Sequence, residues 1–404
     1  MAKPVISVII PAYNCAAYLP DAIQSALDQT WPRVEVVVIN DGSPDNTDEV
    51  VQPYLDRIMY IKQENKGLSG ARNAGFRASQ GEFICFLDAD DMLLPEKFEK
   101  QMAVFEREPD LGVVISGFIF VTEDGNTNLQ TVHKFWHRDA LAHLLNHEVF
   151  PPHAPLIRRS ALEDSSLFPE DIITAESQED WQLWLDLALN GVQFSSVPEP
   201  LCNYRRRQGS ISSYPLKHLD GARRVVGWLR KHPKGKRYRR QIERLAGIVE
   251  MERAARAWQS GQTDLAVQTF IQAVKQSPAY WMEPNTWLRL FTTSLRFEDA
   301  IKWNKKPDPE WYKKIVLERY LVDVRDGISQ KAYRKLSAAA WLMLGDLVYG
   351  TYNDEMRRQA LKKAWNADWI TCLSVQDFPS TIRAFLGPRA IDRLKNRKIH
   401  GEEK

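Results

Sequence analysis

The first hundred residues repeat one pattern: a short apolar run, a polar loop, and a stretch with apolar residues at helical spacing. The apolar runs lie at 5–10, 34–39, 58–61 and 83–87. Strands that alternate with helices predict βαβ units in a doubly wound, mostly parallel sheet. The polar loops would then lie at the carboxyl ends of the strands, where open α/β sheets bind their ligands.

The fourth apolar run ends in three carboxylates, Asp88, Asp90 and Asp91. Neighbouring carboxylates repel one another, and burying them is costly unless a cation or hydrogen bonds compensate. Hard oxygen ligands on a short bend suit Mg²⁺ or Mn²⁺ together with a substrate phosphate. The alternative is an acidic loop in which Asp91 caps a helix that starts at Leu94.

The loops after the first two runs carry groups that suit a nucleotide. Pro11 and Tyr13 follow the first run, and a turn there can place the tyrosine or backbone groups against a flat base. An ordinary Pro/Asn turn is the alternative. Asp41 follows the second run and can accept a hydrogen bond from a base or a ribose hydroxyl. The alternative there is a turn in which Asp45 or Thr47 caps the next helix.

Charged residues further along suit a diphosphate or a proton transfer. Arg72 lies near a glycine-spaced helix start and Arg207 in a cationic loop, and both suit phosphate. Asp180 lies in the first turn of a helix predicted at 179–190, where the helix dipole favours the ionised carboxylate of a general base. The alternatives are a capped helix with close sheet packing for the Arg72 motif, a solvated charge run for Arg207, and simple charge complementarity with the helix dipole for Asp180. His153, in a proline-rich link, is more readily structural.

The chain changes character after about residue 215, where strand patterns give way to long amphipathic helices. We therefore predict an α/β domain at 1–232 and an all-α C-terminal domain at 233–404. The second contains two imperfect copies of a helix pair that weakly resembles a tetratricopeptide unit. A basic segment between Arg223 and Arg244 suits a solvated helix face, with docking on an anionic membrane surface as the alternative.

Composition limits the function classes. The chain has 404 residues, of which 44% are hydrophobic and 26% charged, and a net charge of +2. These values are typical of a soluble globular protein and predict no polyelectrolyte binding to nucleic acid. Four scattered cysteines favour a reducing compartment. With no apolar stretch of signal-peptide or membrane-spanning length, we expect a cytoplasmic protein, and peripheral contact with the inner membrane stays open.

Five motifs in order, each after the expected element, make the chain resemble the family 2 glycosyltransferases with a GT-A fold. The likeness covers roughly the first 215 residues and rests on the segments 8–14, 40–43, 65–75, 86–91 and 179–181. Helical tails occur on some members of that family. The QxxRW motif of processive synthases is absent from the sequence, so the resemblance is to non-processive members.

The resemblance implies a donor and a reaction. The donor would be a nucleotide-diphospho-sugar, with UDP as the favoured nucleotide, bound with Mg²⁺ or Mn²⁺. A hexosyl group would pass, with inversion, to the hydroxyl of a saccharide, lipid-linked or protein acceptor in cell-surface polysaccharide or glycoconjugate synthesis. A non-catalytic nucleotide-sugar-binding or scaffold protein is the alternative, and a nucleotidyltransferase a weaker one.

The resemblance also assigns roles by motif. Asp41 and Arg72 would hold the base, beside the turn of Pro11 and Tyr13, and Asp88 would hold the ribose.

Asp90, the last acid of the DxD motif, would bind the metal, and Asp180 would be the catalytic base. Two segments depart from the family pattern. Arg207 stands where the family has a histidine, so a phosphate contact is expected there in place of metal ligation. The segment 167–170 reads Leu-Phe-Pro-Glu where Gly-Phe-Asp-Glu is common, so the acceptor loop is expected to differ.

Overall fold

The computed structural model describes residues 3–123, 127–131, 140–147, 150–170, 178–207, 215–260 and 262–276, with a few isolated positions beyond 329. Contacts divide the chain into two units, Met1–Ile242 and Glu243–Lys404. The predicted domain boundary at 232/233 stays a prediction. Most of the predicted helical domain, including the second copy of its helix pair, lies outside the described residues.

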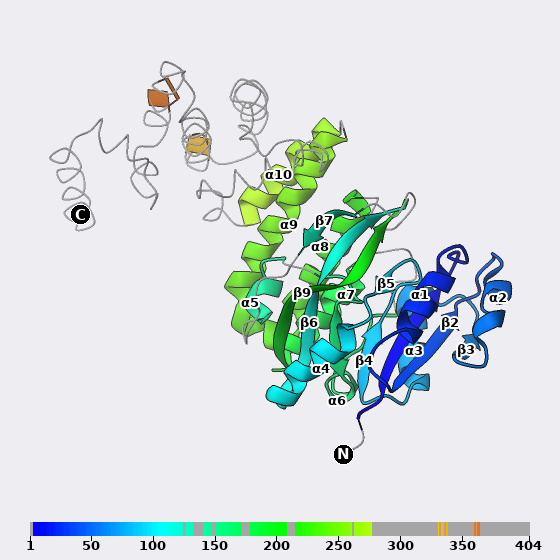
Figure 1. Cartoon of the computed structure of the whole chain (residues 1–404). Coiled ribbons are helices and arrows are strands. Elements are labelled where there is room, and N and C mark those ends of the chain that lie inside the picture. The colour runs from blue at the N-terminus through cyan, green and yellow to red at the C-terminus, as the bar shows by residue number, and fades with distance from the viewer. Residues whose placement is uncertain are drawn as a thin grey trace. The chain divides into compact units, whose positions relative to one another are not determined.

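A nine-stranded mixed sheet organises the first unit (Figure 1), in the order β3-β2-β1-β4-β8-β6-β9-β5, with β7 paired to β6. Its first half contains β1 (Ile6–Ala12), β2 (Val34–Asn40), β3 (Met59–Lys62) and β4 (Phe83–Phe86). These four strands pair in parallel. Their carboxyl ends therefore meet at one edge, as the alternation of strand and helix patterns predicted.

The second half of the sheet is mixed. It contains β8 (Pro155–Arg158), β6 (Leu111–Thr122), β9 (Gln193–Arg206), β5 (Met92–Leu93) and β7 (Thr127–Thr131). The β8 strand pairs antiparallel with both β4 and β6, whereas β6 and β9 pair in parallel. The long β9 strand also pairs with β5, just beyond the acidic loop.

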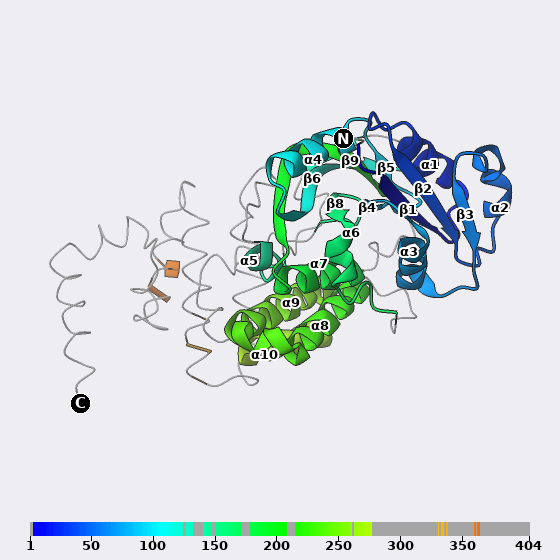
Figure 2. The same cartoon turned by 90° about the horizontal axis from the view of Figure 1, so that it is seen from below.

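Helices cover both faces of the sheet, as Figure 2 shows. On one side lie α1 (Leu19–Leu27) and α4 (Lys97–Arg107), and on the other α3 (Gly67–Ala78) and α7 (Glu179–Leu189). The α3 helix approaches β1 very closely. A Cβ atom at Gly75 would lie 2.3 Å from the Cγ2 atom of Ile9, so only glycine fits there.

The remaining helices are either short connections between strands or lie in the stretch 215–276. They are α2 (Thr47–Val50), η1 (Gln52–Tyr54), α5 (Ala140–Leu144), α6 (Arg159–Glu163), α8 (Pro215–Lys231), η3 (Pro233–Tyr238), α9 (Arg239–Gln259) and α10 (Thr263–Gln276). Within α10, Ala266, Phe270 and Ala273 are buried on one face. None of the helices that the structure describes is long and apolar enough to cross a membrane.

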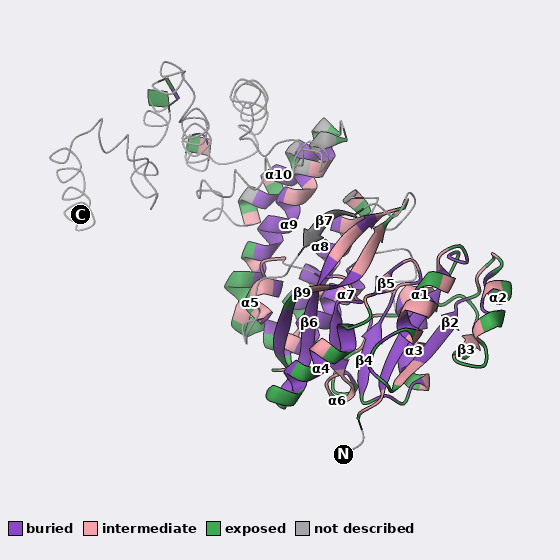
Figure 3. Cartoon of the chain, in the orientation of Figure 1, coloured by how far each residue is buried: buried purple, intermediate pink, exposed green. Residues whose placement is uncertain are grey.

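The core lies between the sheet and its helices (Figure 3). Every residue of β1 and β4 is buried, as expected of strands covered on both faces. The β3 strand is at the edge of the sheet, and Met59 is correspondingly exposed. This buried framework holds the loops at the carboxyl ends of β1, β2 and β4 in fixed positions.

Candidate active site

Arg72 on α3 is the central cation of the site. Its Nη2 atom lies 2.6 Å from Asp88 Oδ1, and its Nη1 atom lies 2.6 Å from Oε1 of Glu179, the first residue of α7. The Arg72 side chain is only 1% exposed. Burial alone would lower the pKa of Arg72, but the charges of Asp88 and Glu179 raise it above its ordinary value, so the guanidinium stays charged. It thereby joins the acidic loop to the start of α7.

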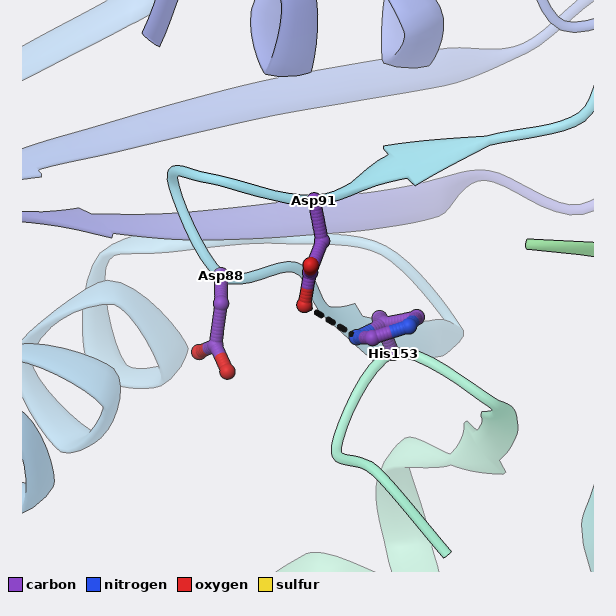
Figure 4. A group of neighbouring side chains, drawn as sticks. All are labelled: Asp88, Asp91 and His153. Atoms are coloured by element: carbon purple, nitrogen blue, oxygen red, sulfur yellow. Dashed lines mark ion pairs between the residues drawn. The ribbon is translucent and has the colours of Figure 1, made fainter. Parts of the chain in front are cut away.

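Asp91 forms a buried ion pair with His153, which precedes β8 (Figure 4). The His153 Nδ1 atom lies 3.0 Å from Asp91 Oδ2, and the two side chains are 0% and 1% exposed. Burial raises the pKa of Asp91 to about 6, against the lowering effect of His153. Burial would lower the pKa of His153, but Asp91 raises it well above its ordinary value. Both groups therefore carry charge at neutral pH.

The alternative in which Asp91 caps the next helix is wrong. The α4 helix begins at Lys97, with Glu96 at its N-cap. The Asp91 carboxylate is instead turned inward, where it accepts the backbone N–H of Arg205 at 2.7 Å in addition to bonding His153. This acid ties the loop after β4 to both β8 and β9.

Asp90 pairs with Arg207, directly after β9. The Arg207 Nε atom lies 2.6 Å from Asp90 Oδ2, and the side chains are 22% and 17% exposed. Burial would lower the pKa of Arg207, and its hydrogen bond to Asp90 raises it overall. Arg205 fixes the loop by donating to the backbone carbonyl of Asp90. The arginines predicted to suit a diphosphate therefore contact the acidic loop itself, which a purely solvated charge run would not do.

Asp180 lies in the first turn of α7, as predicted, and is half-buried. Burial and the charge of Glu179 raise the pKa of Asp180 to about 7, against the lowering effect of Arg72. Its Oδ1 atom accepts the backbone N–H of Trp181 at 2.7 Å. A carboxyl group that changes charge near neutral pH can accept a proton under physiological conditions.

The buried face of α7 holds Asp180 in place. Trp181 and Trp184 are fully buried, and the Trp181 indole donates to the carbonyl of Leu144 at 3.1 Å. The helix ends before Gly191, whose φ of +86° is the left-handed conformation expected after a helix. At the other end Gln178 is the N-cap residue and has a φ of 88°, a strained backbone for a non-glycine residue. The helix therefore begins at Glu179, and Asp180 follows in its first turn.

Asp41 is only 2% exposed and accepts two hydrogen bonds, from Gln63 Nε2 at 2.6 Å and from the backbone N–H of Lys66 at 2.9 Å. Pro11 is buried at the end of β1, whereas Tyr13 is 49% exposed and has room to pack against a base. Among the described residues, no hydrogen bond or ion pair joins Arg72 to Asp41.

At the second loop Asp45 forms the expected turn, but the N-cap of α2 is Asn46, which makes no side-chain cap hydrogen bond. Asp45 Oδ1 accepts the Ser43 hydroxyl at 2.5 Å and the backbone N–H of Thr47 at 3.1 Å, at the start of α2. Its other oxygen accepts the backbone N–H of Ala16 at 2.8 Å. Asp45 therefore braces the loops after β1 and β2 against each other, and Asp41 is left for another role.

The acids fit a divalent cation, but not all equally. Asp88, Asp91 and His153 offer ligand atoms within 4.8 Å of one another. Asp91 and His153 are buried and bonded to each other, so a cation between them would not reach a substrate phosphate. Asp88 and Asp90 are partly exposed. Arg72 binds one carboxylate oxygen of Asp88, and Arg207 binds one carboxylate oxygen of Asp90. Among the described residues, the second carboxylate oxygen of each aspartate has no hydrogen-bond donor. These two oxygens suit Mg²⁺ or Mn²⁺, so Asp90 stays the predicted ligand.

Sequence reasoning missed Glu179 as the second partner of Arg72. It also missed a buried network around Lys97, whose ammonium donates to Gln101 Oε1 and to the Ala154 carbonyl, both at 2.8 Å. This network holds the segment that carries His153. The i,i+4 spacing of Lys97 and Gln101 is a weak signal, because it occurs on many exposed helices.

The segment 167–170, whose sequence departs from the family pattern, lies beside Arg72. Asn73 donates to the Phe168 carbonyl and to Glu170 Oε1, both at 2.8 Å. The Arg72 guanidinium lies 5.1 Å from the centre of the Phe168 ring. The segment therefore helps to hold the central arginine.

The family model described as glycosyl transferase family 2 matches residues 7–165. TuaG of Bacillus subtilis, named for teichuronic acid biosynthesis, is 31% identical over 218 residues, which are 52% of this chain and 82% of TuaG. An uncharacterized glycosyltransferase of Nostoc is 37% identical over 190 residues, 45% of this chain and 56% of that protein. One from Rickettsia conorii is 40% identical over 125 residues, 30% of this chain and 21% of that protein. The chain thus spans only about a fifth to a half of several relatives.

Among solved structures, TarS 1–349 of S. aureus in complex with UDP aligns with a TM-score of 0.47 at 16% identity, over 90% of this chain and 92% of that one. The mannosyltransferase PcManGT from Pyrobaculum calidifontis, in complex with GDP-Man and Mn²⁺, aligns with a TM-score of 0.48 at 16% identity, over 85% and 88%. Both TM-scores are below 0.5, so the assignment rests on the sequence matches and the mixed α/β sheet. The chain belongs to the family 2 glycosyltransferases, and its first unit has their GT-A fold.

Proposed function

We propose that the protein is an inverting, metal-dependent glycosyltransferase. It would move a hexosyl group from a nucleotide-diphospho-sugar, with UDP as the favoured nucleotide, to an acceptor hydroxyl in cell-surface polysaccharide or glycoconjugate synthesis. The observation that carries the proposal is the Arg72 guanidinium, which binds Asp88 and Glu179 at once. It sets Asp180, a half-buried carboxyl with a pKa of about 7, beside the acidic loop. The name of TuaG supports the polysaccharide context.

In this proposal the loops after β1 and β2 bind the nucleoside. The exposed Tyr13 ring, next to Pro11, would pack against the base, and the buried Asp41 carboxylate would accept from it. Asp88 would accept from the ribose through the oxygen that Arg72 leaves available. Arg72 would then act on the nucleoside through Asp88, because its own side chain is only 1% exposed.

Asp180 would supply the base. An acceptor hydroxyl is a poor nucleophile at neutral pH, so Asp180 would take its proton as the new C–O bond forms. The bond from the anomeric carbon to the diphosphate oxygen breaks in the same displacement, which inverts that carbon. A divalent cation on Asp90 would offset the charge gained by the leaving diphosphate. Arg207 lies where it could bind the same diphosphate.

A panel of nucleotide sugars with Mn²⁺ tests the proposal by the release of nucleoside diphosphate from slow donor hydrolysis. The wild-type chain should turn over at least one donor, and Asp180→Asn should still bind it while losing nearly all transfer to an added acceptor. A matched control is Asp186→Asn, since Asp186 lies on the same helix as Asp180 but accepts its hydrogen bonds from Ser166. Donor binding without any turnover by the wild-type chain would instead favour a nucleotide-sugar-binding or scaffold protein.

We also propose that the protein works at the inner face of the membrane. Between Lys231 and Arg240 the chain presents exposed basic side chains and contains no acidic residue; the exposed ones are Lys231, Lys234, Lys236, Arg237, Arg239 and Arg240. Gly235 keeps this segment compact, because a Cβ there would meet the Leu229 carbonyl at 2.1 Å. Each cation near an anionic lipid surface contributes about 1 kcal/mol, and a lipid-linked acceptor would lie there.

Sedimentation with lipid vesicles tests this location. The chain should bind vesicles that contain phosphatidylglycerol and not neutral phosphatidylcholine vesicles, and added salt should release it. Replacing Lys236, Arg237, Arg239 and Arg240 by glutamine should abolish the binding. Equal binding to the two vesicle types would contradict the proposal.

A further inference from the structure

We propose that Arg207 occupies the metal-binding carboxylate until a donor arrives, so that the metal enters the site together with the donor diphosphate and binds poorly alone. This inference rests on the proposed function and concerns the order in which the site fills. It starts from an unexpected pairing: the residue predicted to bind the diphosphate and the residue predicted to bind the metal bind each other, at 2.6 Å.

The three acids of the loop differ in how exchangeable their cations are. Asp91 and His153 are both buried. Asp88 is 23% exposed, but its partner Arg72 is only 1% exposed and also holds Glu179. Of these three pairs, only Asp90–Arg207 has both side chains partly exposed, at 17% and 22%. A ligand from solvent can therefore reach both partners of this pair.

The pair competes directly with a metal. The Arg207 guanidinium takes one oxygen of Asp90, and its charge repels a second cation approaching the other oxygen. Arginine stays charged at neutral pH and ligates no metal. Arg207 therefore acts as a competing cation at this carboxylate.

A diphosphate can release the pair. Guanidinium groups bind phosphate oxygens through two parallel hydrogen bonds. Apart from Asp90, Arg207 contacts the Cys15 sulfur, at 3.2 Å from its Nη2 atom, and the face of Tyr18. A thiol is a weak acceptor, so little is lost when Arg207 turns to a phosphate. Asp90 is then left for the metal that arrives with the diphosphate.

The backbone on either side stays in place during this exchange. Arg205, two residues earlier, donates its backbone N–H to Asp91 and its Nε–H to the carbonyl of Asp90. It also forms an ion pair with Asp21 at 3.1 Å. Only the side chain of Arg207 has to move, which keeps the exchange local.

Isothermal titration calorimetry of the full chain tests the inference with two ligands, Mn²⁺ alone and UDP or GDP at saturating Mn²⁺. Arg207→Gln should bind Mn²⁺ alone at least tenfold more tightly than the wild type, and should bind the nucleotide at least tenfold more weakly. Arg207→Lys keeps the charge and should bind Mn²⁺ alone as weakly as the wild type. Arg206→Gln is the matched control, because Arg206 lies over the Phe120 ring at 4.1 Å, and it should change neither affinity.

Two results separate the failures. If the wild type binds nucleotide with Mn²⁺ but Arg207→Gln gains no affinity for Mn²⁺ alone, the inference is overturned and the proposed function stands. If the folded wild type binds neither UDP nor GDP with Mn²⁺, the donor-binding function fails and the inference fails with it. Tight binding of Mn²⁺ alone to the wild type also overturns it.

Discussion

The two halves of the sheet bring opposite charges to the site. The parallel half, β3-β2-β1-β4, ends in acids: Asp41 after β2, and Asp88, Asp90 and Asp91 after β4. The mixed half brings two of the cations that balance them.

Those cations are His153 before β8 and Arg207 after β9. The third, Arg72 on α3, comes from the parallel half and reaches across to Glu179 on α7. Acids can therefore crowd at the end of one strand because distant segments supply a cation for each. This comparison predicts that contacts joining the halves contribute more stability than contacts within one half.

Removing the Arg72 side chain should have the largest effect. Arg72→Ala leaves Asp88 and Glu179 without their shared cation, and breaking a buried pair in this way costs about 3–5 kcal/mol. Urea denaturation of the full chain, followed by tryptophan fluorescence, measures the loss. Arg77→Ala is the control on the same helix, because its pair with Glu170 is exposed and should be worth less than about 1 kcal/mol. Equal losses in the two variants would contradict the linking role of Arg72.

Replacing His153 should have the next largest effect. His153→Ala leaves Asp91 buried with one hydrogen bond and no cation, which should cost about 2–3 kcal/mol. His153→Gln can still donate a hydrogen bond and should lose less. The same denaturation measurement checks both variants, and an unchanged stability in His153→Ala would show that the mixed half does not support the acidic loop.

A contact within the parallel half should have the smallest effect. Asp45→Ala removes the brace between the loops after β1 and β2 and should cost about 1 kcal/mol, as for a lost hydrogen bond. Burial opposes, but hydrogen bonds from Ser43, Thr47 and Ala16 lower the pKa of Asp45 overall. Its contribution is therefore present above the ordinary carboxyl pKa and disappears as pH falls through the lowered value. A loss as large as that of Arg72→Ala would reverse the comparison.

The parallel half could be predicted from sequence because its signals are local. An uninterrupted apolar run followed at once by acids identifies both β4 and its loop. Helical spacing and an acid in the first turn likewise identified α7 and placed Asp180. Each of these features is specified by residues next to one another in the chain.

The counter-charges could not be predicted because they depend on packing between distant segments. His153 is a lone histidine in a proline-rich link, and only the pairing of β8 with β4 brings it to Asp91. Lys97 would be expected at the surface of an amphipathic helix, yet it is fully buried against the Ala154 carbonyl. The inward turn of Asp91 follows from these contacts.

The pH dependence of transfer tests the central claim most directly, that Asp180 is the base set in place by the Arg72 bridge. Because burial and Glu179 raise the pKa of Asp180 to about 7, the carboxyl is protonated below that pH and cannot accept the acceptor's proton. For the donor that gives turnover, kcat/KM should rise about tenfold per pH unit below pH 7 and level off above it. A profile that stays flat from pH 5 to 8 in the wild-type chain would contradict the claim.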